Sequence, residues 1–89
     1  MKGRRVLTSV DGWLPPLERG DYGRVTNGSV DPNTSVGWWQ VRAPDGSAVC
    51  LNPKIHMIIE HPDGSISVRP SIVTHSWHGW LDEGEWKSV

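Results

Sequence analysis

Four histidines and a single cysteine are the side chains of this chain best suited to holding a soft metal ion. His75 and His78 are close together, and Cys50, His56 and His61 precede them. Zinc sites usually contain a Cys-x-x-Cys pair or a comparable Cys/His pair, and the chain has neither. On one strand, His56 and His61 would point to opposite faces because their separation is odd. The sequence therefore predicts no metal site, with a small metal-binding protein left as an alternative.

Nucleophilic catalysis would need a cysteine or serine beside a histidine that a third group orients, and no local motif assembles such a set. Cys50 lies between Val49 and Leu51 in an alternating apolar segment, which predicts a buried thiol without a catalytic role. Asp45 and Asp63 occupy turn positions where a carboxylate caps backbone N–H groups, so we expect both to be structural. The sequence predicts a protein without enzymatic activity and without a cofactor.

Tryptophan is the most unusual component, because the chain has six tryptophans but one tyrosine and no phenylalanine. A tryptophan combines a large apolar area with one N–H donor, so it suits both small cores and the centres of binding sites. Adjacent tryptophans on a strand point to opposite faces, so one of such a pair faces outward or toward a partner. An outward tryptophan beside histidine or arginine can stack on a nucleotide or anchor a protein interface. We predict binding residues at Trp38, Trp39, Arg42, Trp77, His78 and Trp80; covering the open end of a small barrel is the alternative role of the tryptophans.

The elements that would position these residues are hairpins. Ten glycines and seven prolines are spread along the chain, and no long window has the apolar period of a helix. Two copies of Pro-Asp-Gly-Ser, at Pro44–Ser47 and Pro62–Ser65, predict two hairpin turns. Apolar residues alternate on both sides of each turn, over Trp38–Ala43 and Val49–Leu51 and over Ile55–Glu60 and Ser65–Arg69. The residues around Asp82-Glu83-Gly84 predict a third hairpin, with strands over His78–Leu81 and Glu85–Lys87.

The first third of the chain is less regular. Arg5–Val10 and Tyr22–Thr26 are candidate strands, and the proline-containing segment Trp13–Leu17 between them is not. Asn27–Gly37 has the composition of a loop, and Pro53 is expected to end the strand that precedes it. These patterns predict an all-β fold, one domain over residues 1–89, with about seven short strands and little or no helix. The hairpins are expected to form a small barrel or a two-layer sheet.

Composition narrows the classes of partner. The formal net charge of −1 argues against nucleic acid, which attracts strongly basic proteins. The basic cluster Lys2, Arg4 and Arg5 has the pattern of a solvated N-terminal segment. The apolar stretch Val6–Val10 is too short for a signal-peptide core or a membrane span. A lone cysteine allows no intramolecular disulfide and favours a reducing compartment, so we expect a cytoplasmic protein.

The C-terminal half carries a resemblance. Its most specific parts are the Pro-Ser-Ile step within Glu60–Ile72 and the His-Gly-Trp-Leu sequence within Trp77–Leu81, followed by Gly84 and Trp86. From about Gly37 to Val89 the chain resembles small uncharacterised proteins encoded by bacteriophages of actinobacteria. Some of those proteins have a cysteine-rich stretch that resembles a metal site, of which only Cys50 is present here. The resemblance implies a phage accessory product made in the host cytoplasm.

Three functions follow as hypotheses. The first is an interaction module, either a single chain or a homo-oligomer, that binds a host or phage protein through an outward tryptophan. The second is an oligomeric sponge that sequesters a nucleotide-like signalling molecule of host defence. The third is a small metal-binding protein, for which His75 and His78 would have to converge with Cys50 or an acid.

Overall fold

The two Pro-Asp-Gly-Ser sequences form hairpin turns, as the sequence predicts. In the computed structural model, which describes residues 1–26, 38–52 and 55–89, the first turn joins β3 (Trp39–Arg42) to β4 (Ala48–Leu51). The second turn joins β5 (Met57–Glu60) to β6 (Ile66–Arg69). Each turn places its glycine at a positive φ, 90° at Gly46 and 89° at Gly64, which a residue with a Cβ rarely adopts.

The third predicted hairpin is also present. It joins β8 (His78–Asp82) to β9 (Glu85–Ser88), and its two turn residues, Glu83 and Gly84, both have positive φ. Positive φ at both central residues is characteristic of the two-residue hairpin turn whose twist matches the strands. β7 (Ile72–Val73) pairs with the other edge of β8, so this sheet has the order β7-β8-β9.

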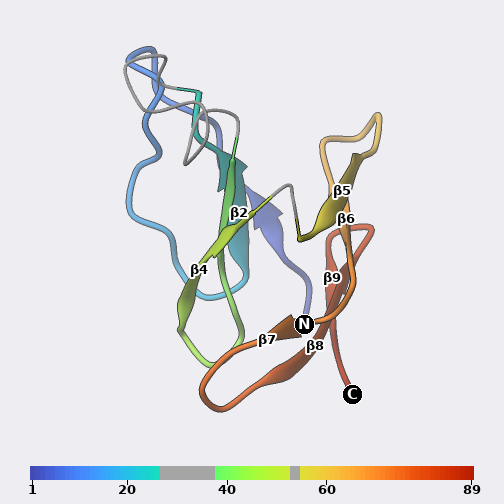
Figure 1. The fold of residues 1–89 in the computed structure, drawn as a ribbon. Helices are drawn as coiled ribbons and strands as arrows, with labels where there is room; N and C mark the ends of the chain where they lie inside the picture. Colours follow the sequence, from blue (N-terminus) through green and yellow to red (C-terminus); the bar gives the residue numbers. More distant parts are fainter. Residues whose placement is uncertain (27–37, 53–54) are drawn as a thin grey trace.

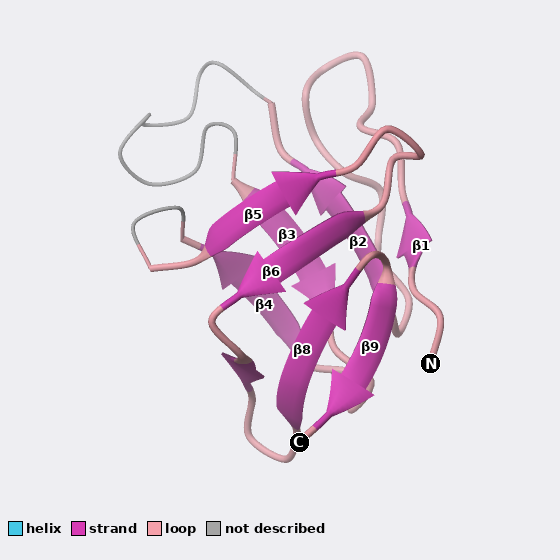
Figure 2. Ribbon diagram, turned by 90° about the vertical axis from the view of Figure 1, so that its right-hand side faces the viewer, coloured by secondary structure: helices cyan, strands magenta, loops and turns pink. Residues whose placement is uncertain are grey.

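The N-terminal segment completes a second, four-stranded sheet. β1 (Arg4–Arg5) runs parallel to β2 (Asp21–Arg24), and β2 pairs antiparallel with β3, which gives the order β1-β2-β3-β4. β5 and β6 form a two-stranded sheet by themselves. Figure 1 shows how the three sheets follow one another along the chain, and Figure 2 shows β5, β6, β8 and β9 in a near layer in front of β2, β3 and β4.

The core lies between these layers and draws side chains from all three sheets. Side chains alternate along a strand, so β3 and β6 each place every second residue in it, Trp39 and Val41 from β3 and Ile66 and Val68 from β6. Leu51, Ile66 and Leu81, one from each sheet, are fully buried. Trp86 is 3% exposed, and its Nε1–H donates a 2.9 Å hydrogen bond to the Gly20 carbonyl. The buried indole N–H therefore has an acceptor.

The all-β prediction is confirmed, since the described residues contain strands and no helix. The structure differs in detail: it has nine short strands in the described ranges rather than seven, and the sheets form layers that do not close into a barrel. β7 was not among the predicted strands, and the candidate strand Arg5–Val10 overlaps β1 at Arg5 alone, since Val6–Val10 are not in a strand. Both β1 and β7 have two residues and are too short for sequence periodicity to detect. The predicted Asn27–Gly37 loop and Pro53 lie outside the described residues, and β4 ends at Leu51.

Candidate binding groove

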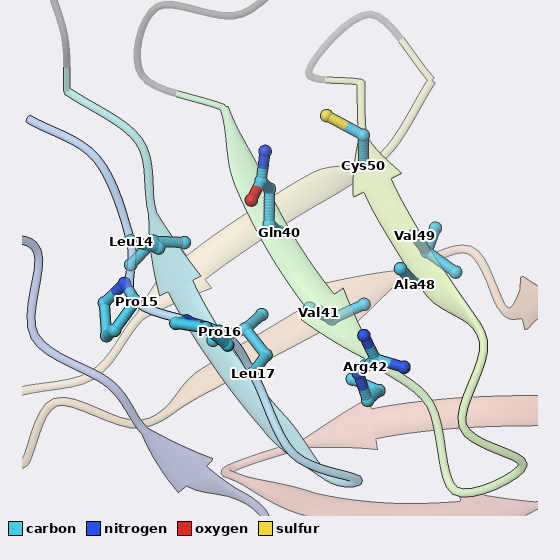
Figure 3. A pocket seen from close by; sticks show the side chains of 10 residues that line it. All are labelled: Leu14, Pro15, Pro16, Leu17, Gln40, Val41, Arg42, Ala48, Val49 and Cys50. Carbon is cyan, nitrogen blue, oxygen red and sulfur yellow. The ribbon is translucent and has the colours of Figure 1, made fainter.

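A groove of about 450 Å³ lies on the outer face of β3 and β4 (Figure 3). Trp39, Val41 and Leu51 point into the core, so the residues between them along the strands point the other way and form the groove floor. The segment before β2 forms the facing wall. The residues that line the groove are Leu14, Pro15, Pro16, Leu17, Gln40, Val41, Arg42, Ala48, Val49 and Cys50.

The wall of the groove consists of two leucines and the two prolines between them. Neither proline has a backbone N–H, so this segment cannot pair as a strand and instead lies across the sheet. Gly23 of β2 permits the close approach, because a Cβ at that position would lie 2.5 Å from Cδ2 of Leu14. The wall therefore presents an extended apolar surface to the groove. It packs against β2 at Gly23, which has no side chain to keep Leu14 away.

Arg42 supplies the positive charge of the groove. Its Nη1 donates a 2.6 Å hydrogen bond to the Gly46 carbonyl in the adjoining turn. Its Nε is buried and has no hydrogen-bond partner among the described residues, and none of their carboxylates is close enough to form an ion pair with this guanidinium. A half-buried arginine without a carboxylate favours an anionic group in a ligand, because charge-assisted hydrogen bonds are the strong ones.

Gln40 and Cys50 face each other across β3 and β4 and form the other polar part of the groove. Their side chains are hydrogen-bonded, which lowers the pKa of the Cys50 thiol, but partial burial raises that pKa more, so it lies above its ordinary value. The thiol is therefore protonated at neutral pH and is a weak nucleophile. None of the residues that line the groove is a histidine or a carboxylic acid that could act as a base toward it.

Cys50 is exposed, so the prediction that it is buried is wrong. The apolar neighbours Val49 and Leu51 suggested burial, but alternation directs Leu51 to the core and Cys50 to the opposite face of β4. A strand with apolar residues at every position gives no period from which its inward face can be read.

Two of the six predicted binding residues are structural in this fold. Trp39 is 6% exposed in the core, and the Arg5 guanidinium lies 4.6 Å from the centre of its ring. Trp77 packs edge-on against Trp86, with ring centres 5.4 Å apart, and its ring covers Gly79 so closely that a Cβ there would lie 2.6 Å from it. Both rings therefore contribute to stability rather than to an open binding surface.

The other predicted residues are accessible but lie apart. Of the six, Arg42 alone lines the groove. Trp38 is half-buried just before β3. His78 is exposed, and its Nε2 is 2.9 Å from Oγ of Ser71. Trp80 borders a hollow of about 230 Å³ on β8, shared with Arg69, Asp82 and Lys87.

The Trp80 hollow differs from the groove in the state of its charges. Asp82 accepts a 3.0 Å hydrogen bond from Arg69 Nη2, and its other oxygen lies 3.5 Å from Lys87 Nζ. Hydrogen bonds from Arg69 and Ser67 lower the pKa of Asp82, so this carboxylate stays charged. It forms ion pairs with both Arg69 and Lys87. Arg42 in the groove, by contrast, forms no ion pair with a carboxylate of the described residues. The groove is also the larger of the two spaces.

The groove-lining residues Leu14–Leu17, Gln40 and Cys50 were not identified from the sequence as binding residues. The two prolines between leucines carried a usable signal, because such a segment cannot be a strand and has apolar side chains to place against something. Nothing in the sequence indicated which sheet the segment would cross. The contact depends on Gly23, which looks like any other turn glycine in the sequence.

Comparisons of the chain with family models, with curated proteins and with solved structures found no match. Within residues 1–26, 38–52 and 55–89, no three His, Cys, Asp or Glu side chains are grouped to hold a metal ion. His61 instead lies with its Nε2 2.7 Å from Oγ of Ser67. In this same part of the chain, no helix has the length and apolar character needed to cross a membrane.

Proposed function

We propose that this protein is a binding module that holds an extended segment of a partner protein in the groove, without catalysing a reaction on it. The observation that carries the proposal is that an apolar wall, Leu14–Leu17, faces across the same groove the guanidinium of Arg42, which forms no ion pair with a carboxylate of the described residues. The resemblance to phage proteins makes a host or phage protein in the host cytoplasm the partner of interest.

The groove chemistry defines the peptide that fits. Apolar side chains of the partner would be buried against the leucines and prolines, each contributing about 25 cal/mol per Å² of apolar surface removed from water. An acidic side chain or a terminal carboxylate would bind the Arg42 guanidinium, and the Gln40 amide offers both a donor and an acceptor to the peptide backbone. The recognition sequence we expect is an apolar pair beside an acidic group.

A binding role is favoured over catalysis by the chemistry of Cys50. Catalysis by a thiol requires thiolate, and partial burial raises the pKa of this one. A nucleotide-like ligand is the second candidate, because the groove volume of about 450 Å³ is within the range of small-molecule sites. It is less favoured because no residue that lines the groove is aromatic, so a base would have no ring on which to stack.

The test is a selection of random peptides on the purified protein, followed by affinity measurement on variants. Ala48 is exposed on the groove floor, so Ala48→Trp would fill the groove without removing a core contact. Val73 is 67% exposed on β7 and lies outside the groove, so Val73→Trp is the matched control. We expect selected peptides to bind the control with unchanged affinity and to bind Ala48→Trp at least about tenfold more weakly.

Arg42→Gln should abolish the preference for acidic peptides, whereas Arg42→Lys, which keeps the charge but not the planar fork, should retain part of it. Peptides that bind Ala48→Trp as tightly as the wild type would contradict the proposal. A nucleotide that raises the melting temperature of the wild type but not of Ala48→Trp would replace the peptide with a small anionic ligand.

A further inference from the structure

The outer edge of β5 is a further surface without a strand partner among the described residues, and it lies on a different sheet from the groove. β5 pairs with β6 on one side, and no strand among the described residues pairs with its other side. Natural edge strands are usually protected from pairing by lysine, by proline, by a bulge or by being very short. Met57 and Ile59 are instead 65% and 47% exposed, and Ile55 just before the strand is 64% exposed.

The hydrogen-bond pattern of the hairpin determines which backbone groups face this edge. His61 N–H bonds to the Ser65 carbonyl at 2.8 Å, and bonded pairs alternate with non-bonded pairs along an antiparallel ladder. Met57 and Ile59 are therefore the residues of β5 whose N–H and C=O groups bond to β6. The N–H and C=O of Ile58, with those of Glu60, point outward.

We propose that β5 pairs antiparallel with β5 of a second copy of this chain, with the two-fold axis passing beside Ile58. Two Ile58 residues then form a bonded pair, each N–H donating to the other carbonyl. Glu60 N–H of each copy donates to the His56 carbonyl of the other. The His56 N–H is not needed, because it already bonds to the Asn52 carbonyl at 2.8 Å. The outward donors of the strand thus find acceptors in this register.

The side chains also match in this register. Met57 of one copy lies opposite Ile59 of the other, so the exposed apolar residues pair on the outer face. His56 lies opposite Glu60, whose Oε2 bonds to Arg5 Nη1 at 3.1 Å, which leaves Oε1 to accept a hydrogen bond from the imidazole. A shift by one residue would direct the side chains of one strand to the opposite face, and it would break both pairings.

The two-fold arrangement determines which sheet of each copy is extended in the dimer. The new pair of strands joins two β5–β6 sheets into one four-stranded sheet that spans both copies. The groove lies on the other sheet, on the outer face of β3 and β4, so both copies keep it open. Pairing of the β5 edges does not depend on what the groove binds, since it involves other residues.

Mass measurement by analytical ultracentrifugation, from about 1 μM to 1 mM, tests the association directly. We expect the wild type to approach twice the monomer mass as its concentration rises. Ile59→Lys, which places a charge on the edge, should raise the dimer dissociation constant at least about tenfold with little change in melting temperature. Val73→Lys replaces another apolar residue that is even more exposed but lies on β7, and this variant should dimerise as the wild type does. A wild type that stays monomeric throughout would overturn the proposal.

Disulfide trapping tests the register, using a Cys50→Ser background that removes the single native cysteine. Met57→Cys and Ile59→Cys chains should each fail to cross-link alone, because neither residue faces its own symmetry mate. Mixed together and oxidised, the two variants should form a covalent heterodimer, since non-bonded antiparallel pairs bring Cα atoms to about 4.5 Å. Cross-linking of either variant with itself, or none in the mixture, would overturn the register.

Discussion

The two Pro-Asp-Gly-Ser hairpins have the same turn but different surroundings. In both, the serine N–H donates a 2.9 Å hydrogen bond to Oδ1 of the aspartate, and the glycine that follows the aspartate has a φ near 90°. The same four residues thus fold the same way twice, as local side-chain to backbone bonding in turns would require. The local sequence accounts for the turn in each case.

The difference lies in what each aspartate reaches beyond its turn. Asp45 Oδ2 accepts hydrogen bonds from Thr74 and from Ser76, at 3.0 Å for the latter, so the first hairpin is attached to the segment between β7 and β8. Among the described residues, Asp63 accepts hydrogen bonds only from Ser65 of its own turn. The first hairpin is held through its turn aspartate and forms the groove floor. The second is held at its turn only through the backbone, where the Gly64 carbonyl accepts a 2.9 Å hydrogen bond from Arg5 Nη1, and its β5 edge has no strand partner among the described residues.

The largest effect that would separate the two hairpins is loss of the aspartate. Asp45→Ala removes the acceptor of bonds that join two sheets, so we expect a clear fall in melting temperature together with weaker peptide binding in the groove. Asp63→Ala removes bonds inside an exposed turn and should lower the melting temperature by roughly one or two degrees. Calorimetry on both variants measures the difference. Equal losses would show that the tertiary bonds of Asp45 contribute nothing.

Acidification should produce the next largest effect. Hydrogen bonds from Thr74, from the Ser47 backbone and from Ser76 hold the pKa of Asp45 well below its usual range. A lowered folded-state pKa contributes stability above the unfolded value of about 3.9, and that stability is lost as the pH falls further toward the folded value. The melting temperature should fall below about pH 4, where the gap between wild type and Asp45→Asn should narrow. A gap that is independent of pH would contradict this account.

The smallest difference between the two hairpins is expected from their glycines. Gly46→Ala and Gly64→Ala each force an L-residue to a φ near 90°, so both should lose about 1 to 2 kcal/mol of unfolding free energy. Gly46→Ala should lose slightly more, because the new methyl would lie 3.3 Å from Arg19 Nη2, while nothing lies within 4 Å of that position at Gly64. Denaturant titration gives both values, and a larger loss at Gly64 would reverse the comparison.

The hairpins were predictable because their signals are local. A Pro-Asp-Gly-Ser turn between alternating apolar residues determines both the turn and the pairing that follows from it, and β3 to β6 appear where the sequence predicts them. The parallel pairing of β1 with β2 was not predictable, because it joins Arg4 to Asp21 across a long segment without periodicity. Long-range pairing depends on the final packing, which a single sequence does not encode locally.

The candidate site was predicted only in Arg42. Four of the six tryptophans were predicted as binding residues, yet in a small protein the apolar area of tryptophan is also needed to fill the core, as Trp39 and Trp86 do. The sequence alone does not distinguish a core tryptophan from a binding tryptophan, because the residues that flank it do not show which face of the strand points to the core. The groove instead depends on small residues, since Gly23 admits Leu14 and Ala48 leaves the floor open.

The exposed Cys50 thiol is a single attachment point for an optical probe of the groove. It is the single cysteine of the chain and lies on the lining of the groove, so a thiol-reactive dye would attach at one known place. Because its pKa is raised, labelling should be slow at neutral pH and faster in mildly alkaline buffer. A dye there whose emission depends on polarity would change colour if the proposed peptide entered the groove, so binding could be followed in one tube without separating bound from free.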